Sequence, residues 1–231
     1  MKLTRALLMI EKALRWVCRK DPDHFLRKVS GVIHVGANSG QERDLYACHK
    51  LHVVWIEPIP EVFEALSTNI ENYPNQIAFQ RLLTDQDGAE HVFHIANNGG
   101  ASSSILELKL HKDIWPGVDY EKSVKLRSTT LDSLIEKEQI DIGKYDALIM
   151  DTQGSELLVL KGAVSALRAF RFVKTEVPDF ESYVGCCQLK DIDSYLRLNG
   201  FREISRHKFA EHKTGGSYFD VIYERDKRSG E

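Results

Sequence analysis

The chain has 231 residues, and its 31 lysines and arginines against 34 aspartates and glutamates leave a formal net charge of -3. Hydrophobic residues make up 42% and charged residues 28%, a globular composition that excludes a disordered or collagen-like protein. The near-neutral charge predicts no nucleic-acid partner, because such proteins cluster basic residues. The four cysteines have no metal or redox spacing, and no apolar run is long enough for a secretory or membrane segment, which predicts a cytoplasmic protein.

Residues 1–29 are predicted to form a helical segment in front of a single domain, residues 30–231. The first 20 residues hold six basic side chains against one acidic side chain, with apolar residues on one helical face. A basic amphipathic helix over residues 2–19 fits contact with an anionic membrane, or packing on the domain or on a second subunit. We favour packing, because most amphipathic helices are half-buried in protein. Formation of a homo-oligomer is left open.

From residue 31 onward, short apolar runs alternate with helical patterns. The strands are predicted at residues 31–36, 52–57, 77–83, 89–96, 147–150, 172–177, 201–207 and 218–223. The helices are predicted at residues 40–50, 60–72, 131–139, 155–170 and 189–198. This alternation predicts an α/β fold with a mostly parallel sheet between two helical layers. The last two strands have no helix between them and must be antiparallel, and residues 97–128 are predicted as an insert.

The first strand ends in the turn Gly36-Ala37-Asn38-Ser39-Gly40. Glycine lets the backbone approach a ligand closely, and asparagine tolerates left-handed dihedral angles. The predicted helix after Gly40 would point its positive end at the same place. Glu57 ends the next strand 21 residues beyond Gly36, the place where an acid accepts both hydroxyls of a ribose. The combination predicts an adenosine-containing cofactor, either a dinucleotide or S-adenosylmethionine.

Two details favour S-adenosylmethionine over a dinucleotide. The glycines are spaced G-x-x-x-G instead of G-x-G-x-x-G, so the glycine that packs helix on strand in dinucleotide folds is missing. The antiparallel strand pair at the end of the chain is also unusual for a dinucleotide fold, whereas it is normal in class I methyltransferases.

Two further predicted strands end in carboxylates. Asp151 follows a buried strand, and Gln153 and Gly154 open the helix after it. Glu176 lies at the end of the next strand, so the two acids are predicted to face one cleft, although a solvated strand end is the alternative interpretation for each. Glu156 is interpreted as a cap of the first helical turn.

Three blocks of the sequence resemble FkbM-type methyltransferases. They are Val-Ile-His-Val-Gly-Ala-Asn-Ser-Gly-Gln-Glu (32–42), Val-Val-Trp-Ile-Glu-Pro-Ile-Pro-Glu-Val-Phe (53–63) and Ile-Met-Asp-Thr-Gln-Gly-Ser-Glu-Leu-Leu-Val-Leu-Lys-Gly-Ala (149–163). The resemblance runs in order from about residue 31 to 225, and the Asp-x-Gln-Gly-x-Glu block is its most specific part. It implies a class I Rossmann-like fold, S-adenosylmethionine as methyl donor, and O-methylation of a hydroxyl on a sugar, glycan or natural product.

The resemblance also implies a place for each part of the cofactor. It assigns the methionine part to Gly36, Asn38 and Gly40, the ribose to Glu57, the adenine to Thr84 and Asp85, and the transferred methyl to Asp151 and Gln153. His34 departs from the pattern, because most relatives carry an aspartate there. His34 is kept among the cofactor-binding candidates and is interpreted as a hydrogen-bonded strand residue rather than as a catalyst.

A sugar hydroxyl is a poor nucleophile until its proton leaves, so a general base or a metal ion assists its methylation. We predict that Asp151 is the base or a metal ligand and that Glu176 assists it. No histidine or cysteine spacing indicates a metal site, and use of a divalent metal is left open. The alternatives are an NAD-dependent oxidoreductase and a non-catalytic cofactor-binding protein.

Overall fold

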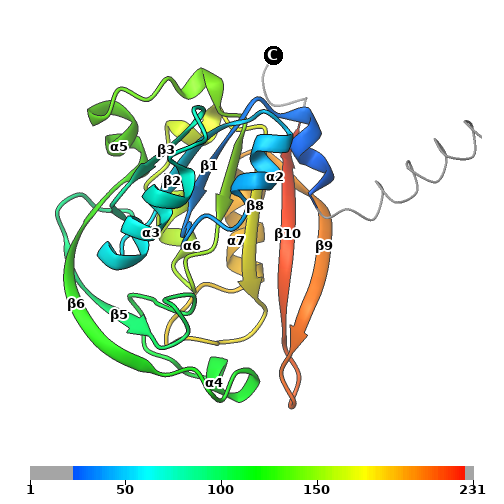
Figure 1. The fold of residues 1–231 in the computed structure, drawn as a ribbon. Helices are drawn as coiled ribbons and strands as arrows, with labels where there is room; N and C mark the ends of the chain where they lie inside the picture. Colours follow the sequence, from blue (N-terminus) through cyan, green and yellow to red (C-terminus); the bar gives the residue numbers. More distant parts are fainter. Residues whose placement is uncertain (1–22, 227–231) are drawn as a thin grey trace, which may run out of the picture.

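The computed structural model describes residues 23–226 (Figure 1). The predicted amphipathic helix over residues 2–19 lies outside the described residues. The main sheet contains β1 (Gly31–Val35), β2 (His52–Ile56), β3 (Gln76–Phe79), β7 (Ala147–Met150), β8 (Phe172–Pro178), β9 (Phe201–Glu211) and β10 (Ser217–Arg225). Their order is β3-β2-β1-β7-β8-β10-β9, and β10 is antiparallel to both of its neighbours. The predicted sheet, mostly parallel with an antiparallel end, is confirmed.

Helices cover both faces of this sheet. The 3-10 helix η1 (His24–Lys28), α2 (Arg43–Cys48) and α3 (Pro60–Ile70) pack on one face, and α5 (Leu131–Lys137), α6 (Glu156–Lys161) and α7 (Leu189–Leu198) pack on the other. Residues 23–29, which belong to the predicted N-terminal segment, are joined to the domain through two fully buried side chains of η1, Phe25 and Leu26. None of the helices described between residues 23 and 226 has the length and apolar character needed to span a bilayer.

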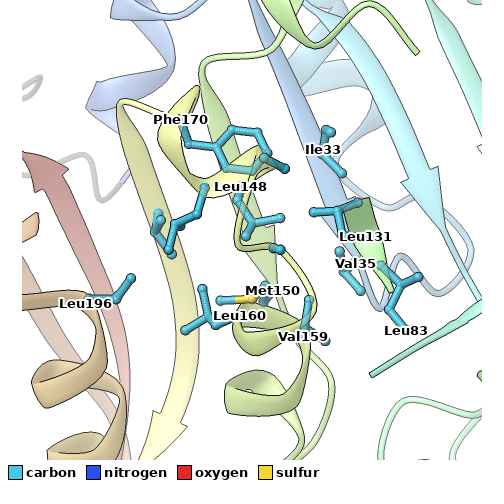
Figure 2. Close-up of a cluster of buried hydrophobic side chains, with 14 of the residues drawn as sticks. Ile33, Val35, Leu83, Leu131, Leu148, Met150, Val159, Leu160, Phe170 and Leu196 are labelled. Carbon is cyan, nitrogen blue, oxygen red and sulfur yellow. The ribbon is translucent and has the colours of Figure 1, made fainter. Parts of the chain in front are cut away.

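The central strands are rich in apolar residues on both of their faces, because both faces of the sheet are buried. Along β1, Ile33 and Val35 point into one hydrophobic cluster, and Val32, which precedes them, points into the other. Figure 2 shows the first cluster, in which Ile33 and Val35 face the same side as Leu148 of β7 and pack with Leu160 of α6. The alternation of side chains thus places one core on each side of the sheet.

A second sheet, which the sequence pattern did not reveal, lies beside the main one (Figure 1). It has the order β4-β6-β5, formed by β4 (Leu82–Leu83), β6 (Tyr120–Thr129) and β5 (Glu90–Ala96). The single strand predicted at residues 77–83 is therefore two strands in different sheets. The predicted insert 97–128 supplies α4 (His111–Ile114) and most of β6. β6 was missed because only two of its ten residues, Val124 and Leu126, are aliphatic.

The helix predicted at residues 155–170 is also interrupted. Helix α6 ends at Lys161, and a short turn, η3 (Ala166–Arg168), follows after a break. A Cβ at Gly162 would lie 2.1 Å from the carbonyl oxygen of Thr84, so the chain passes too close to its neighbour for a side chain. The Asp132 carboxylate then accepts the N–H groups of Ser165 and Ala166, both at 2.8 Å, and starts the new turn. The remaining short helix is η2 (Ile142–Lys144).

The direction of strand addition reverses between β1 and β7, and Gly36 lies at this point. Gly36 has a left-handed φ of +78°, and a Cβ there would lie 1.8 Å from the backbone oxygen of Asp151. The turn after β1 and the end of β7 are therefore in direct backbone contact.

We expect Gly36→Ala to destabilise the fold much more than Gly88→Ala. Gly88 has nearly the same φ, +74°, but no atom lies within 4 Å of the added Cβ. Gly88→Ala should therefore cost only the left-handed strain of about 1–2 kcal/mol, whereas Gly36→Ala adds a backbone clash. Urea unfolding of both variants measures the difference, and equal losses would contradict the close approach.

Candidate active site

A cavity of about 270 Å³ opens at the carboxyl ends of β1, β2 and β7. The predicted site residues that line it are His34, Gly36, Asn38, Glu57, Asp151 and Gln153. Loops that are far apart in the sequence thus meet at the point where the strand order reverses.

The glycine turn is held in shape by the carboxylate at the end of β2. One oxygen of Glu57 accepts the backbone N–H of Asn38 and the other accepts that of Ile59, both at 2.9 Å. Asn38 has a φ of +44°, and its side-chain amide donates to the carbonyl oxygen of Gly99, which ties this turn to the insert. Since a carboxylate accepts up to about four hydrogen bonds, Glu57 retains lone pairs for ligand hydroxyls.

Burial dominates the electrostatics of Glu57. Its side chain is only 4% exposed, and desolvation raises its pKa to about 7, against the lowering effect of the two backbone N–H groups. A ligand that brings positive charge or hydroxyl donors into the cavity would stabilise the ionised form.

Gly40, Thr84 and Asp85, which the resemblance placed around the cofactor, are not among the residues that line this cavity. Gly40 packs against Leu66 of α3. Thr84 is fully buried and donates its backbone N–H to the carbonyl oxygen of Thr129, and Asp85 is exposed. Because the predicted third strand is split, the chain enters the second sheet at Leu82 and Leu83, which still line the cavity, and Thr84 and Asp85 lie beyond them.

His34 lines the cavity and also contacts α2, which covers this face of the sheet. Its Nδ1 lies 3.1 Å from the hydroxyl of Tyr46, and its ring stacks on Trp55 at 5.1 Å between centroids. Burial lowers the pKa of His34 to about 3, and the nearby Lys174 contributes in the same direction. A neutral, hydrogen-bonded histidine fits the interpretation as a strand residue and is unsuited to accept charge at neutral pH.

The loop after β7 is organised by Glu156. This buried carboxylate accepts the backbone N–H groups of Thr152 at 2.9 Å and Gly154 at 3.1 Å, and the thiol of Cys187 lies 3.3 Å away. Glu156 therefore closes the whole loop, beyond the helix cap that its position suggested. The closed loop presents Asp151 to the cavity and holds Gln153 in a left-handed conformation with a φ of +52°.

Comparison with known proteins places this arrangement in a family. The methyltransferase FkbM domain model matches residues 34–203, which include the glycine turn, Glu57 and the loop after β7. The chain belongs to the FkbM methyltransferase family. The predicted methyl donor, S-adenosylmethionine, is the cofactor of this family.

Hexuronic acid methyltransferase AglP from Haloferax volcanii is 28% identical to this FkbM chain over 146 residues, which are 62% of the chain and 54% of AglP. The chain thus spans about half the length of this relative. An uncharacterized protein from Listeria monocytogenes has the same fold with a TM-score of 0.50 at 8% identity, covering 88% of this chain and 66% of that protein. The magnesium protoporphyrin IX methyltransferase of Synechocystis PCC 6803, solved with bound S-adenosylmethionine, has a TM-score of 0.49 at 11% identity, covering 95% and 79%.

Asp151 of this FkbM domain lies beside Glu176. The register pairs Met150 of β7 with Thr175 of β8, so the residues that follow them are neighbours. Both residues line a smaller hollow of about 130 Å³, together with Lys174 and Asp220. Asp151 is therefore accessible from the cavity and from a second compartment.

The environment raises the pKa of both acids. Burial raises the pKa of Asp151 to about 7, against the lowering effect of a hydrogen bond from Gln153. Burial also raises the pKa of Glu176 well above its usual range, and the charges of Asp151 and Asp220 add to the rise. The surroundings favour the protonated form of Glu176 more strongly than that of Asp151, so Asp151 is the member of the pair that ionises more readily.

Sequence reasoning missed three cavity residues and one neighbour of the site. Arg81, Phe93 and Glu42 line the cavity, and Tyr183 lies behind Gln153. The predicted start of the helix after Gly40 could have drawn attention to Glu42. The other residues lie outside every motif, and only the folded chain brings them to the site.

We expect Glu57→Gln to destabilise the chain more at pH 5 than at pH 8. Because the folded-state pKa of Glu57 is raised from 4.5 to about 7, its ionisation removes stability as pH rises through that interval. A glutamine does not ionise, and its N–H₂ also faces one of the two backbone N–H donors. The difference between the pH values should approach about 3 kcal/mol.

Denaturant unfolding at both pH values measures this difference. Glu64→Gln on the exposed face of α3 controls for the general effect of removing a carboxylate. A Glu57→Gln penalty that is equal at both pH values would contradict the burial argument.

Proposed function

We propose that this chain is an S-adenosylmethionine-dependent O-methyltransferase that acts on a hydroxyl of a sugar, glycan or natural product. The observation that carries the proposal is the position of Asp151, which lines both the cavity and the second hollow. A base in such a position can touch an acceptor on one side while a methyl donor occupies the other.

The cavity fits a cationic nucleoside. Among its described lining residues, the carboxyls of Glu42, Glu57 and Asp151 outnumber one basic side chain, Arg81, which is paired with Glu138 at 3.2 Å. A surplus of carboxyls favours the positive sulfonium and ammonium groups of S-adenosylmethionine. Glu57 would hold the ribose hydroxyls, and the turn at Gly36 and Asn38 would hold the methionine part.

When bound, S-adenosylmethionine supplies a methyl group on a positively charged sulfur. The protein's contribution is to align the acceptor oxygen with that methyl and to remove the hydroxyl proton. Asp151 would accept this proton, because its pKa of about 7 leaves it ionised in part of the molecules at neutral pH. Glu176 would stay protonated beside it, which limits the negative charge next to the acceptor.

The charge around Asp151 also bears on the type of oxygen that is methylated. AglP is named for a hexuronic acid, which offers both hydroxyl and carboxylate oxygens. A carboxylate needs no base, and it would approach the carboxyls of Asp151 and Asp220 with Lys174 as the only lysine or arginine among the described lining residues. Like-charge repulsion therefore favours a neutral hydroxyl as the acceptor group.

The same charges disfavour the alternative of an NAD-dependent oxidoreductase. A dinucleotide would bring a negatively charged pyrophosphate into a cavity whose described lining offers Arg81 as its basic side chain.

Within residues 23–226, no three histidine, cysteine, aspartate or glutamate side chains are grouped as metal ligands, and no metal role is assigned to them.

We expect S-adenosylmethionine and S-adenosylhomocysteine to raise the melting temperature of the chain, and NAD to leave it unchanged. Differential scanning fluorimetry with each compound measures this, with Glu57→Gln as the variant that should lose the response. Stabilisation by NAD alone would overturn the proposed cofactor.

We expect Asp151→Asn to lower methyl transfer at least about 100-fold, because an amide cannot act as a base, with unchanged affinity for S-adenosylhomocysteine. The wild-type rate should rise with pH, with a midpoint near 7, and level off above it, since Asp151 must be ionised. Radiolabelled methyl transfer to a panel of glycans and calorimetry supply the two measurements. Asp141→Asn, at an exposed position before η2, is the matched control, and an Asp151→Asn variant with normal turnover would exclude the base.

A further inference from the structure

A buried tyrosine outside every sequence motif is linked to Asp151 through one side chain. Tyr183 follows β8 and is 1% exposed, and its hydroxyl lies 2.6 Å from Oε1 of Gln153. The Nε2 of Gln153 lies 2.6 Å from Oδ1 of Asp151. The three side chains therefore form a continuous hydrogen-bonded row that ends on the proposed base.

The order of donors and acceptors in this row follows from chemistry. An ionised carboxylate can only accept hydrogen bonds, so the N–H₂ end of Gln153 must face Asp151. The carbonyl end then faces Tyr183, whose hydroxyl must donate to it. If the amide rotated by half a turn, its carbonyl would confront Asp151, an arrangement that is favourable only when Asp151 is protonated.

Tyr183 and Gln153 are both held by segments from elsewhere in the chain. The Tyr183 ring packs on His111 of the insert at 4.9 Å between centroids. The backbone N–H of Val184 donates to the carbonyl oxygen of Glu107 at 2.8 Å. The hydroxyl of Ser104 donates to the backbone carbonyl of Gln153 at 2.8 Å. The tyrosine is thus a fixed reference point against which the amide is oriented.

We propose that Tyr183 is a positioning residue that selects the orientation of the Gln153 amide and thereby keeps an N–H donor on Asp151. This inference rests on the proposed function of Asp151 as the base. The oriented donor stabilises the ionised carboxylate against the cost of burial, so Asp151 remains usable as a base near neutral pH.

Several other charged or titratable groups face Asp151 and would remain unchanged when Tyr183 is altered. They are His34 of β1, Glu42 before α2, Tyr46 of α2, Glu57 after β2, Glu156 of α6, Lys174 and Glu176 of β8, Tyr218 and Asp220 of β10, and Asp23 before η1. Of these groups, Glu176 also receives a hydrogen bond from Gln153 that lowers its pKa, so its carboxyl is followed in the same titration.

The test is the titration midpoint of Asp151 in the cofactor-free full chain, followed by carbon-13 NMR of its carboxyl from about pH 5 to 9. Tyr183→Phe should raise the midpoint by about one pH unit, because the amide loses the partner that orients it. Gln153→Ala should raise it similarly, and the double variant should show no further rise. Tyr195→Phe, which removes a hydroxyl bonded to the carbonyl oxygen of Leu160 in the core, should leave it unchanged.

An unchanged midpoint in Tyr183→Phe would overturn the inference, and so would a Tyr183→Phe shift of equal size in the Gln153→Ala background. If Tyr183→Phe does not fold, 3-fluorotyrosine at position 183 replaces it in the test. This substitution keeps the ring and makes the hydroxyl a stronger donor to Gln153. The midpoint should then fall, and no change would overturn the inference.

The outcome is distinguishable from a failure of the proposed function. The titration is measured without cofactor or acceptor, so a shift in Tyr183→Phe supports the positioning role even if Asp151→Asn retains turnover. Conversely, the Asp151→Asn variant could be inactive while Tyr183→Phe leaves the titration midpoint of Asp151 unchanged. That result would support Asp151 as the base and overturn the positioning role of Tyr183.

Discussion

The close approach between the ends of β1 and β7 is the constraint on which the site depends. No side chain fits at Gly36, because a Cβ would lie 1.8 Å from the backbone oxygen of Asp151. This contact brings the turn that would hold the cofactor and the proposed base into one cavity. It lies where strand addition reverses, so the helices that follow the two strands diverge to opposite faces and leave room for a ligand.

The second constraint is the concentration of carboxyls in a buried place. Glu57, Asp151 and Glu176 all have raised pKa values because burial penalises their ionised forms. Glu57 accepts two backbone N–H groups and Asp151 accepts the amide of Gln153, whereas Glu176 lies beside Asp151, whose charge adds to the rise of its pKa. Such an environment favours a cationic ligand, and it keeps the pKa of Asp151 at about 7. Base-assisted methyl transfer from a sulfonium requires both properties.

The insert contributes more to the site than its composition suggested. It supplies β6 to the second sheet, fixes Asn38 through the carbonyl of Gly99, and holds Gln153 through Ser104. These contacts are backbone-directed or polar, so they leave no periodic trace in the sequence. Residues 97–128 therefore read as a loop in the sequence, whereas in the structure they form part of one wall of the cavity.

The local sequence was sufficient to determine the layered fold, the glycine turn, Glu57 and the neighbouring pair Asp151 and Glu176. Their signals are apolar strands of recognisable period and polar residues at strand ends, which parallel pairing brings to one edge. Tertiary structure alone decided the split of the third strand, the break at Gly162, the position of Thr84 away from the cavity, and the place of Tyr183. Each of these depends on a contact between distant segments, and a short stretch of sequence carries no information about the neighbour that it will meet.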